Sequence, residues 1–497
     1  MTPSDLDLIA SRATAAAPVW AATAPRRRAA ALVAVADALT AASAELVALG
    51  SAETGLSEQR LSGEVARTAV QLRLFADVVV DGGYLDVRID DSDPNFALGV
   101  RPDVRRYLVP IGPVLNFSAS NFPFAFSVAG GDTASALAAG CPVIVKAHSG
   151  HPRLSSRTGE VVRAALTAAG APEGTLQLIY GQDDGVAMLK DARIGAGSFT
   201  GSIRVGQLLA GIAAGRPKPI PFFGELGSVN PTFATAAAVA DRPGELAEGY
   251  VVSVSGSAGQ LCTKPGFLFL PVGHGLVARL ATLAVAVAEH RLLHPSIARG
   301  YRERREAILG TPGVSVIAEG SLRIDDEDQG WATPTIVSVP LATLLAHRDT
   351  LLDEAFGPLS IVVEYDEEPA LATVTAELFE GNLTGSVHIA TGEDSPALRE
   401  LVAVLSAHAG RVIVNGWPTG VAVTPAMQHG GPWPATTNDS STSVGTAAIG
   451  RFLRGVAYQN TPAALLPEPL RDDNPWGVVQ HRSPAGESLA WGSRVRT

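Results

Sequence analysis

The chain has 497 residues, of which 46% are hydrophobic and 18% charged, and its net charge is −11. This length and composition predict two or three domains with well-buried cores, and the negative charge argues against a general surface for nucleic acid or an anionic membrane. Only two cysteines are present, which excludes a disulfide framework and is typical of the reducing cytoplasm.

The N-terminus and the apolar runs indicate neither a secretory signal nor a membrane anchor. Residues 1–7 carry acids where a signal peptide carries positive charge. The most apolar run, 280–288, is too short to span a bilayer. We therefore expect a cytoplasmic protein.

The N-terminal region has helical patterns. Residues 4–50 are Ala-rich with apolar residues at helix spacing, which predicts one or two packed helices, and residues 51–77 predict another pair. We interpret the basic triplet at 26–28 as a solvated helix start and not as a nucleic-acid patch.

Strand patterns begin near residue 100. Residues 100–109 alternate in charge and predict a half-exposed strand, and 111–117 predict a buried strand that runs into a loop containing Asn121. A helical pattern covers 124–139, and 141–146 predict a short buried strand.

Strands and helices then alternate. We expect strands at 175–180, 197–199 and 220–223 and helices at 155–169, 183–190 and 202–214. This alternation predicts βαβ units and a mostly parallel sheet, which binds ligands at the carboxyl ends of its strands. Lys146, Gly201, Ser202 and Glu225 lie at such ends. The turn at Gly201 and Ser202 opens a helix and could hold a phosphate or be a plain N-cap, since no G-x-G-x-x-G motif is present.

The second half of the chain repeats the α/β pattern, with a helix expected at 276–293. Glu354 and Phe356 precede a strand, where they could bind sugar hydroxyls and a flat ring, or be a capping acid and a core side chain. His429 lies in a Gly/Pro-rich loop, 427–437, and has no partner at metal-ligand spacing. We interpret it as structural or pocket-lining.

Cys262 is the candidate nucleophile. It lies in a Gly-rich stretch, 253–266, where glycines let the backbone approach a ligand, whereas Cys141 starts an apolar strand and is interpreted as a core thiol. A thiol nucleophile must become a thiolate, and hydrolysis of its acyl intermediate needs a base that activates water. Glu225 could be that base if the fold brings the two residues together.

Several separated motifs resemble, in order and spacing, those of the aldehyde dehydrogenase superfamily, and they cover about residues 107–435. They are Ser120-Asn121-Phe-Pro, Val145-Lys146, Ser198-Phe-Thr-Gly-Ser202, Glu225-Leu-Gly, Gly259-Gln-Leu-Cys262 and Glu354-Ala-Phe-Gly-Pro358. More narrowly, four segments resemble the 2-oxoglutarate semialdehyde (2,5-dioxovalerate) dehydrogenases: 121–133, 146–152, 227–231 and 429–436.

The resemblance implies an α/β fold with a Rossmann-like cofactor domain, an α/β catalytic domain and a small oligomerisation arm. We place these at residues 1–228, 229–435 and 436–497, with the strand at 100–109 contributing to the arm. A homodimer or homotetramer is implied as well. The strand at 100–109 and the polar tail beyond 466 have the character of edge elements that need a partner.

The resemblance also implies catalytic roles. Cys262 would attack the aldehyde, and the resulting oxyanion would lie between the Asn121 amide and the backbone N–H of Cys262. Glu225 would activate the water that hydrolyses the thioester.

The cofactor would be NAD or NADP. Its riboses would contact Lys146 and Glu354, its nicotinamide ribose would lie near Phe356, and its diphosphate would meet the turn at Gly201 and Ser202.

Ser149 departs from many NAD-preferring members, which carry a glutamate three residues after the lysine. Without that carboxylate no like charge repels a 2′-phosphate. Lys146, with His148 or Arg153 nearby, could attract one, so we favour NADP.

The narrower resemblance implies 2-oxoglutarate semialdehyde as the substrate. The carboxylate at its far end needs a cation that the sequence does not identify.

One alternative is a broad-specificity aliphatic aldehyde dehydrogenase. Another is a non-redox thiol hydrolase or acyltransferase, which would need a histidine base, although none lies near Cys262 in sequence. A CoA-acylating dehydrogenase is disfavoured because Glu225 offers a water-activating base, and a catalytically silent protein is disfavoured by the intact Cys262, Glu225, Asn121 and Lys146.

Overall fold

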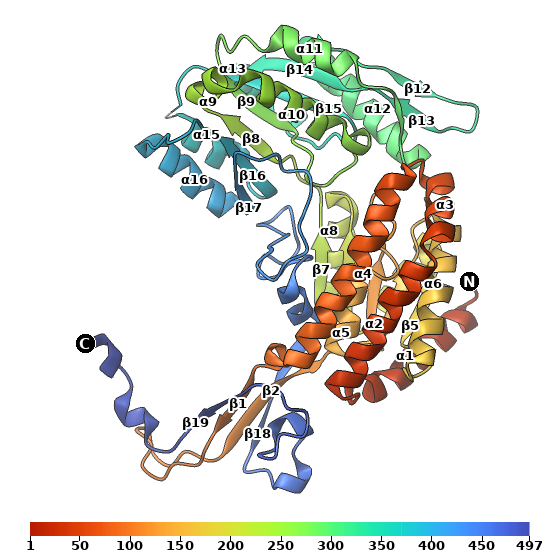
Figure 1. The fold of residues 1–497 in the computed structure, drawn as a ribbon, viewed down its shortest axis with the longest axis vertical. Helices are drawn as coiled ribbons and strands as arrows, with labels where there is room; N and C mark the ends of the chain where they lie inside the picture. The colour runs from red at the N-terminus through yellow and green to blue at the C-terminus, as the bar shows by residue number, and fades with distance from the viewer. Residues whose placement is uncertain (369, 497) are drawn as a thin grey trace.

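A computed structural model describes residues 1–368 and 370–496 of the chain. Figure 1 shows two α/β units, one above the other, and an arm that extends from the lower unit towards the C-terminus.

The lower unit contains a five-stranded parallel sheet of order β5-β4-β3-β6-β7. Its first strand is therefore central, as in doubly wound folds, and the order reverses between β3 and β6. The strands are β3 (Val114–Phe117), β4 (Val143–Lys146), β5 (Leu176–Ile179), β6 (Ala196–Thr200) and β7 (Phe222–Glu225). The helices are α1 (Pro3–Ala21), α2 (Pro25–Ala41), α3 (Ser43–Thr54), α4 (Glu58–Asp81), α5 (Asp132–Ala139), α6 (Pro152–Ala168), α7 (Gln182–Lys190) and α8 (Ile203–Ala214).

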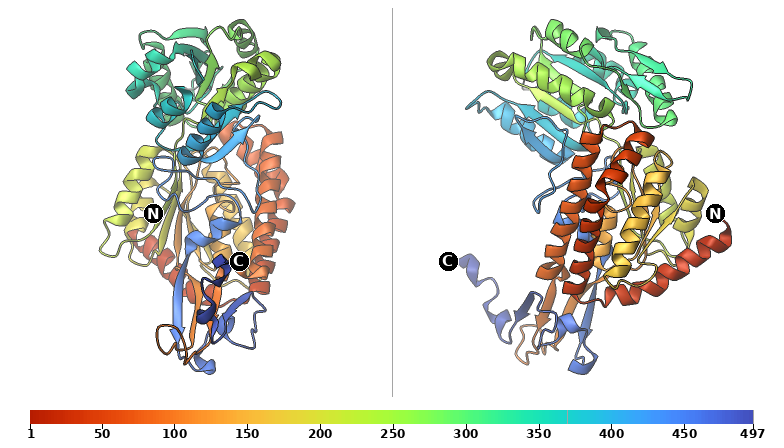
Figure 2. Two further views of the ribbon diagram at one scale, coloured as in Figure 1. Left: turned by 90° about the vertical axis from the view of Figure 1, so that its left-hand side faces the viewer. Right: turned by 45° about the vertical axis from the view of Figure 1, so that its right-hand side comes forward.

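Both faces of this sheet are covered by helices, as the side views in Figure 2 show. Val114 and Val143 pack into a core with α2, α4 and α6, whereas the adjacent Leu115 and Ile144 pack into a second core with α1, α7 and α8. Because successive strand residues point to opposite faces, continuous apolar runs are what a sheet buried on both sides requires.

The helices differ from four sequence expectations, two in their number and two in their extent. The pattern at 124–139 forms a helix only from Asp132, because Gly131 has a φ of +52°, which a helix cannot continue through. Residues 4–50 contain three helices, and 51–77 contain the end of α3 and the single helix α4. The expected helix at 276–293 ends at Val285.

The basic triplet at 26–28 is also not fully solvated. Arg28 is 1% exposed and donates a hydrogen bond of 2.9 Å to the Tyr84 hydroxyl. A buried guanidinium needs such acceptors, and this one joins α2 to the segment that follows α4.

The upper unit contains a seven-stranded sheet of order β11-β14-β15-β9-β8-β16-β17, in which only β11 is antiparallel. Its strands are β8 (Pro231–Ala234), β9 (Phe267–Pro271), β11 (Ser315–Ala318), β14 (Thr335–Pro340), β15 (Leu359–Tyr365), β16 (Asn382–His388) and β17 (Ala409–Val414). The helices are α9 (Ala236–Asp241), α10 (Pro243–Ser255), α11 (Val277–Val285), α12 (Pro295–Leu309), α13 (Leu341–Ala346), α14 (Arg348–Leu351), α15 (Ala370–Leu378) and α16 (Pro396–His408). A small sheet of β10 (His290–Arg291), β13 (Gly330–Ala332) and β12 (Leu322–Ile324) lies beside it.

The arm is a four-stranded sheet of order β18-β2-β1-β19. Its strands are β1 (Val87–Asp90), β2 (Val104–Pro110), β18 (Leu453–Gln459) and β19 (Gln480–Ser483). The expected strand at 100–109 is therefore β2, but β2 is not an edge, because β18 and β1 pair with its two sides. The edges are β18 and β19.

Among the described residues, no single helix combines the length and apolarity needed to cross a membrane. Only α2 and α3 taken together pass that test, and a bend of 68° separates them.

Candidate active site

The carboxyl ends of the lower sheet carry the predicted site residues. Lys146 ends β4 and Glu225 ends β7, while Asn121 follows β3 and the turn at Gly201 and Ser202 follows β6. All strands of this sheet are parallel, so these ends share one edge.

Cys262 reaches this edge from the upper unit on a strained loop after α10. Ser257 and Ala258 have positive φ angles of 52° and 53°, and Gly259 has 64°. Two consecutive non-glycine residues in this region cost about 1–3 kcal/mol each, a cost that recurs at functional sites. At Gly259 a side chain would strike the Gly357 carbonyl. The loop is held beyond the cysteine by Asn230, whose amide donates to the Cys262 carbonyl at 2.7 Å.

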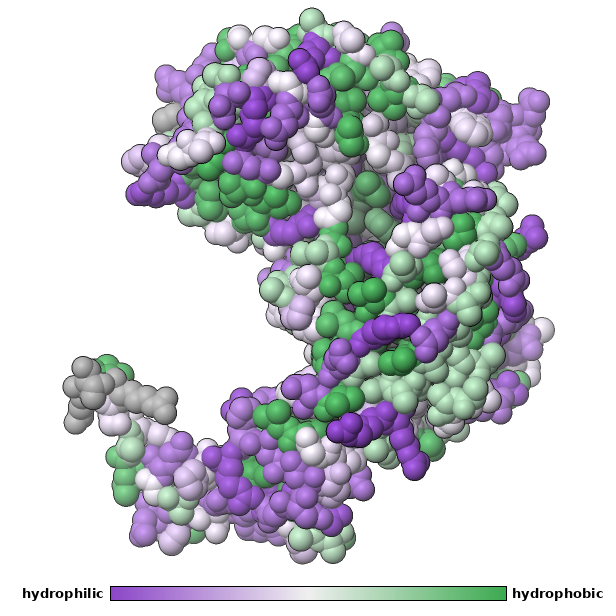
Figure 3. All heavy atoms as spheres, viewed as in Figure 1, coloured by the Kyte–Doolittle hydropathy of each residue, from purple (hydrophilic) through white to green (hydrophobic). Residues whose placement is uncertain are grey.

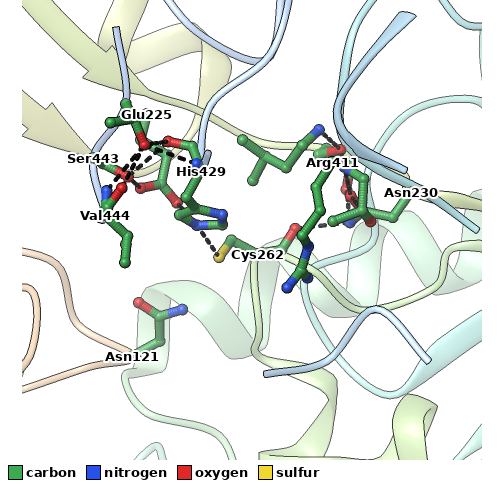
Figure 4. Close-up of polar contacts among 12 residues, drawn as sticks. Asn121, Glu225, Asn230, Cys262, Arg411, His429, Ser443 and Val444 are labelled. Atoms are coloured by element: carbon green, nitrogen blue, oxygen red, sulfur yellow. Dashed lines mark hydrogen bonds and ion pairs between the residues drawn. The ribbon is translucent and has the colours of Figure 1, made fainter. Parts of the chain in front are cut away.

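The structure brings Cys262, Glu225 and His429 together (Figure 4). The Cys262 sulfur lies 3.6 Å from Nε2 of His429, and the same Nε2 lies 2.8 Å from Oε1 of Glu225. The ligand-type atoms of all three side chains lie within 4.8 Å of one another. His429 thus has two partners in space that its sequence spacing did not indicate.

The loop carrying His429 is fastened to β7. The N–H of Leu226 donates to the Ala435 carbonyl at 2.8 Å, just beyond the end of the strand. Ser443 closes the arrangement: its hydroxyl donates to Oε2 of Glu225 at 2.5 Å, and its N–H donates to the His429 carbonyl at 2.8 Å. Both carboxylate oxygens therefore have a neighbour that orients them.

The pKa values of Cys262 and Glu225 are shifted in opposite directions. Burial, reinforced by the negative charge of Glu225, raises the pKa of Cys262 well above its usual range. Burial would also raise the pKa of Glu225, but attraction to His429 and hydrogen bonds from His429 and Ser443 outweigh it, and the pKa is lowered. At neutral pH the site therefore holds a carboxylate beside a thiol, and the thiol needs a proton acceptor before it can attack.

Asn121 is 6% exposed, and its amide donates to the Gln260 carbonyl at 3.1 Å, two residues before Cys262. An amide has two N–H groups, so one is left for a ligand. Figure 4 shows this side chain beside Cys262.

Other expected cofactor residues lie in the loops that follow β4 and β6. Ser149 is exposed in the loop after Lys146. Ser202 caps α8, because its side chain accepts a hydrogen bond from Val205 N–H at 3.4 Å, and Gly201 and Ser202 are both exposed. The first N–H groups of any helix lack partners within it, so this turn keeps donors for an anion.

Glu354 and Phe356 are both half-buried, ahead of β15. Burial raises the pKa of Glu354 to about 7, against the attraction of the buried Lys264. A Cβ at Gly227 would meet Oε2 of Glu354, so this carboxylate lies directly against the glycine. Glu354 therefore faces the segment that directly follows Glu225.

Cys141 is fully buried, and burial raises its pKa to about 12. It is the core thiol that the sequence predicted. His429 was predicted to be structural or pocket-lining, and it lies against Cys262 and Glu225. The contacts of Ser443 with Glu225 and of Asn230 with the cysteine loop were not predicted. For His429 the one available signal was its glycine-rich loop, which lies 167 residues from Cys262.

Comparisons with known proteins show the family to which this chain is related. Residues 1–441 match the model of the Aldehyde dehydrogenase family. An alpha-ketoglutaric semialdehyde dehydrogenase of Acinetobacter baylyi is 41% identical over 424 residues, 85% of this chain and 80% of that one. Alpha-ketoglutaric semialdehyde dehydrogenase 2 of Azospirillum brasilense is 43% identical over 433 residues, which are 86% of this chain and 81% of that one. The crystal structure of PnpE in complex with nicotinamide adenine dinucleotide superposes with a TM-score of 0.75 at 22% identity, over 92% of this chain and 90% of that one. The chain belongs to the aldehyde dehydrogenase family.

Proposed function

We propose that the protein oxidises an aldehyde to a carboxylate with NAD(P) through a covalent intermediate on Cys262. The observation that carries the proposal is the meeting of Cys262 with Glu225 at the carboxyl edge of a doubly wound sheet, 3.6 Å and 2.8 Å from the shared His429 nitrogen. Ligands of such sheets bind at this edge, so nucleophile, base and cofactor would share one place.

In the proposed reaction the Cys262 sulfur adds to the aldehyde carbon and releases its proton to solvent, so that Glu225 stays ionised for the later step. The Asn121 amide donates to the oxyanion of the thiohemiacetal. Bound NAD(P) supplies the acceptor for the hydride whose departure leaves a thioester. Glu225 then takes a proton from the water that hydrolyses the thioester, which releases the carboxylate and restores the thiol.

The residues that would hold the cofactor fit an anionic dinucleotide. The turn at Gly201 and Ser202 offers backbone donors for the diphosphate, and Lys146 and Glu354 offer a cation and a carboxylate for ribose oxygens. We propose NADP as the preferred form, since Ser149 places no carboxylate beside a 2′-phosphate.

The proposed substrate is 2-oxoglutarate semialdehyde. The support is the name of the two relatives that are 41% and 43% identical over most of this chain. The test compares this aldehyde with pentanal, an uncharged aldehyde of equal length, by following reduced cofactor. We expect kcat/KM to favour the acidic aldehyde by about one to two orders of magnitude, the value of one charge-assisted contact. Equal kcat/KM would leave a broad-specificity aldehyde dehydrogenase.

A thiol hydrolase is the second candidate, and the contact between Cys262 and His429 is the observation that favours it, because a cysteine hydrolase uses a neighbouring histidine. It would release acid from a thioester or ester without any nicotinamide cofactor. If the enzyme converts an aldehyde to a carboxylate only when NAD(P) is present, thiol hydrolysis is excluded as its main activity.

We also propose a homo-oligomer, a cytoplasmic location, and the domain division at residues 228 and 435. Two features support the oligomer: the arm sheet exposes the edges of β18 and β19, and the upper sheet ends in the edge strand β17. Free Cys141 and Cys262 are consistent with a reducing compartment.

A further inference from the structure

The substrate proposed above carries a carboxylate at the end away from the aldehyde. A buried carboxylate needs a cation with free donors, and arginine is the side chain best suited to it. The inference below rests on the proposed function and concerns which arginine does this.

Two arginines near the cysteine loop are already engaged. Arg60 donates to the Ser257 hydroxyl and to the Asn121 carbonyl, so it supports the loops on either side of the nucleophile. Arg411, which Figure 4 shows beside Cys262, donates to the carbonyls of Gly420 and Pro418.

Arg67 is different. Within the described residues it donates no hydrogen bond to a side chain or carbonyl and forms no ion pair, and its Nη1 is buried without a partner. Folded proteins satisfy most of their buried polar groups, and an exception calls for a role. A ligand carboxylate would supply the missing acceptor.

The position of Arg67 suits a substrate held on Cys262. Its guanidinium carbon lies 5.4 Å from the centre of the Phe126 ring, and that ring lies 6.3 Å from the ring of His429. His429 in turn touches the Cys262 sulfur at 3.6 Å. One aromatic ring therefore separates the cation from the imidazole of the catalytic cluster, which matches a short substrate with reacting and charged groups at opposite ends.

Arg67 remains a cation in this setting. Burial lowers its pKa, and attraction to the carboxyl groups of Glu64 and Glu225 opposes that shift. Glu64, three residues before it on α4, accepts hydrogen bonds from the N–H groups of Phe124 and Ala125. None of the described acids forms an ion pair with Arg67.

We propose that Arg67, on α4, binds the distal carboxylate of the substrate and that Phe126 forms the apolar wall between this cation and the catalytic cluster.

The test is Arg67→Gln, with Arg73→Gln as the matched control. Arg73 lies on the same helix, but its guanidinium pairs with Asp37 at the exposed surface. We expect Arg67→Gln to lower the ratio of kcat/KM for 2-oxoglutarate semialdehyde to kcat/KM for pentanal about ten- to hundredfold, mainly through the KM of the acidic aldehyde. Arg67→Lys should recover part of the loss, and Arg73→Gln should change neither substrate.

The outcomes separate the two proposals. Equal losses for both aldehydes in Arg67→Gln would show a structural role and overturn this inference alone. A wild-type preference for the acidic aldehyde that survives in Arg67→Gln would place the carboxylate elsewhere and also overturn it. A wild-type enzyme that oxidises pentanal as well as the acidic aldehyde would overturn the proposed substrate and this subsite with it.

Discussion

Nε2 of His429 lies 2.8 Å from Oε1 of Glu225. The two residues are 1% and 4% exposed, so this contact is formed away from bulk water. A carboxylate in such a place is stable only when donors surround it. The Ser443 hydroxyl donates to Oε2 and Nε2 of His429 lies against Oε1, and both contacts lower the pKa of Glu225. They would keep Glu225 ionised for its proposed role as base.

We therefore expect His429 to position Glu225. In His429→Leu the donor is lost and the pKa of Glu225 should rise. Glu225 accepts a proton only when ionised, so the acid limb of the deacylation rate should move to higher pH. One charge-assisted hydrogen bond is worth about 1.5–3 kcal/mol, or roughly one to two pH units. The measurement is kcat against pH, checked by single-turnover hydrolysis of the acyl-enzyme.

The control is His429→Gln, whose amide keeps an N–H near the position of Nε2 and should restore part of the acid limb. Ser443→Ala should shift the limb in the same direction, because it removes the donor to Oε2. A His429→Leu enzyme that loses rate at every pH with an unmoved limb would show that His429 only packs the loop.

Glu225→Gln should separate the two halves of the reaction. The amide cannot take a proton from water, so hydrolysis should slow while formation of the thioester continues. We expect a burst of reduced cofactor roughly stoichiometric with enzyme and then a slow steady state. Turnover at the wild-type rate would remove Glu225 from the mechanism.

The two cysteines should respond differently to substitution. Cys262→Ala should abolish aldehyde oxidation, while Cys141→Ala should keep it, because Cys141 is enclosed between the lower sheet and Phe452. Iodoacetamide followed by mass spectrometry gives an independent measurement: native enzyme should be alkylated at Cys262 and protected at Cys141. Comparable loss of activity in both variants would contradict the assignment.

The strand ends could be predicted from sequence because the information is local. Short apolar runs alternate with helical periodicity, and the last residue of each run is visible: Lys146 and Glu225 were placed this way, and both end strands of one parallel sheet. The error at 124–139 has an equally local cause, since Gly131 interrupts a pattern that is otherwise apolar and helical.

The contact of His429 with Cys262 could not be predicted because it depends on the packing of distant loops. The two residues are 167 positions apart, and backbone hydrogen bonds with the end of β7 and with Ser443 hold the loop of His429 at the site. Arg28 shows the same limit: its charge predicted exposure, and only the fold supplies the Tyr84 hydroxyl that lets it be buried.

The choice of cofactor can be tested at Ser149. The side chain is exposed three residues beyond β4, near the half-buried Lys146 and the exposed Arg153. His148 adds no charge, because burial lowers its pKa well below the usual range. Ser149→Glu should place a carboxylate near a 2′-phosphate and lower kcat/KM for NADP roughly tenfold or more relative to NAD. Ser149→Gln is the neutral control, and an unchanged NADP/NAD ratio in Ser149→Glu would place the phosphate elsewhere.

The last prediction concerns assembly. In Figure 1 the strand β17 and the arm face each other across an open space, which Figure 3 shows as a hollow in the molecular surface. Both borders of this space are sheet edges, and an uncovered edge is an aggregation hazard that a second subunit removes. We expect light scattering at micromolar concentration to give the mass of a dimer or tetramer. Val414→Lys, at a valine 51% exposed on β17, should shift the mass towards the monomer, whereas Val316→Lys, 53% exposed on β11 at the opposite edge of the same sheet, should not. A monomer mass for the unaltered protein would refute the oligomer, and equal effects of the two substitutions would refute the assignment of the β17 edge to the interface.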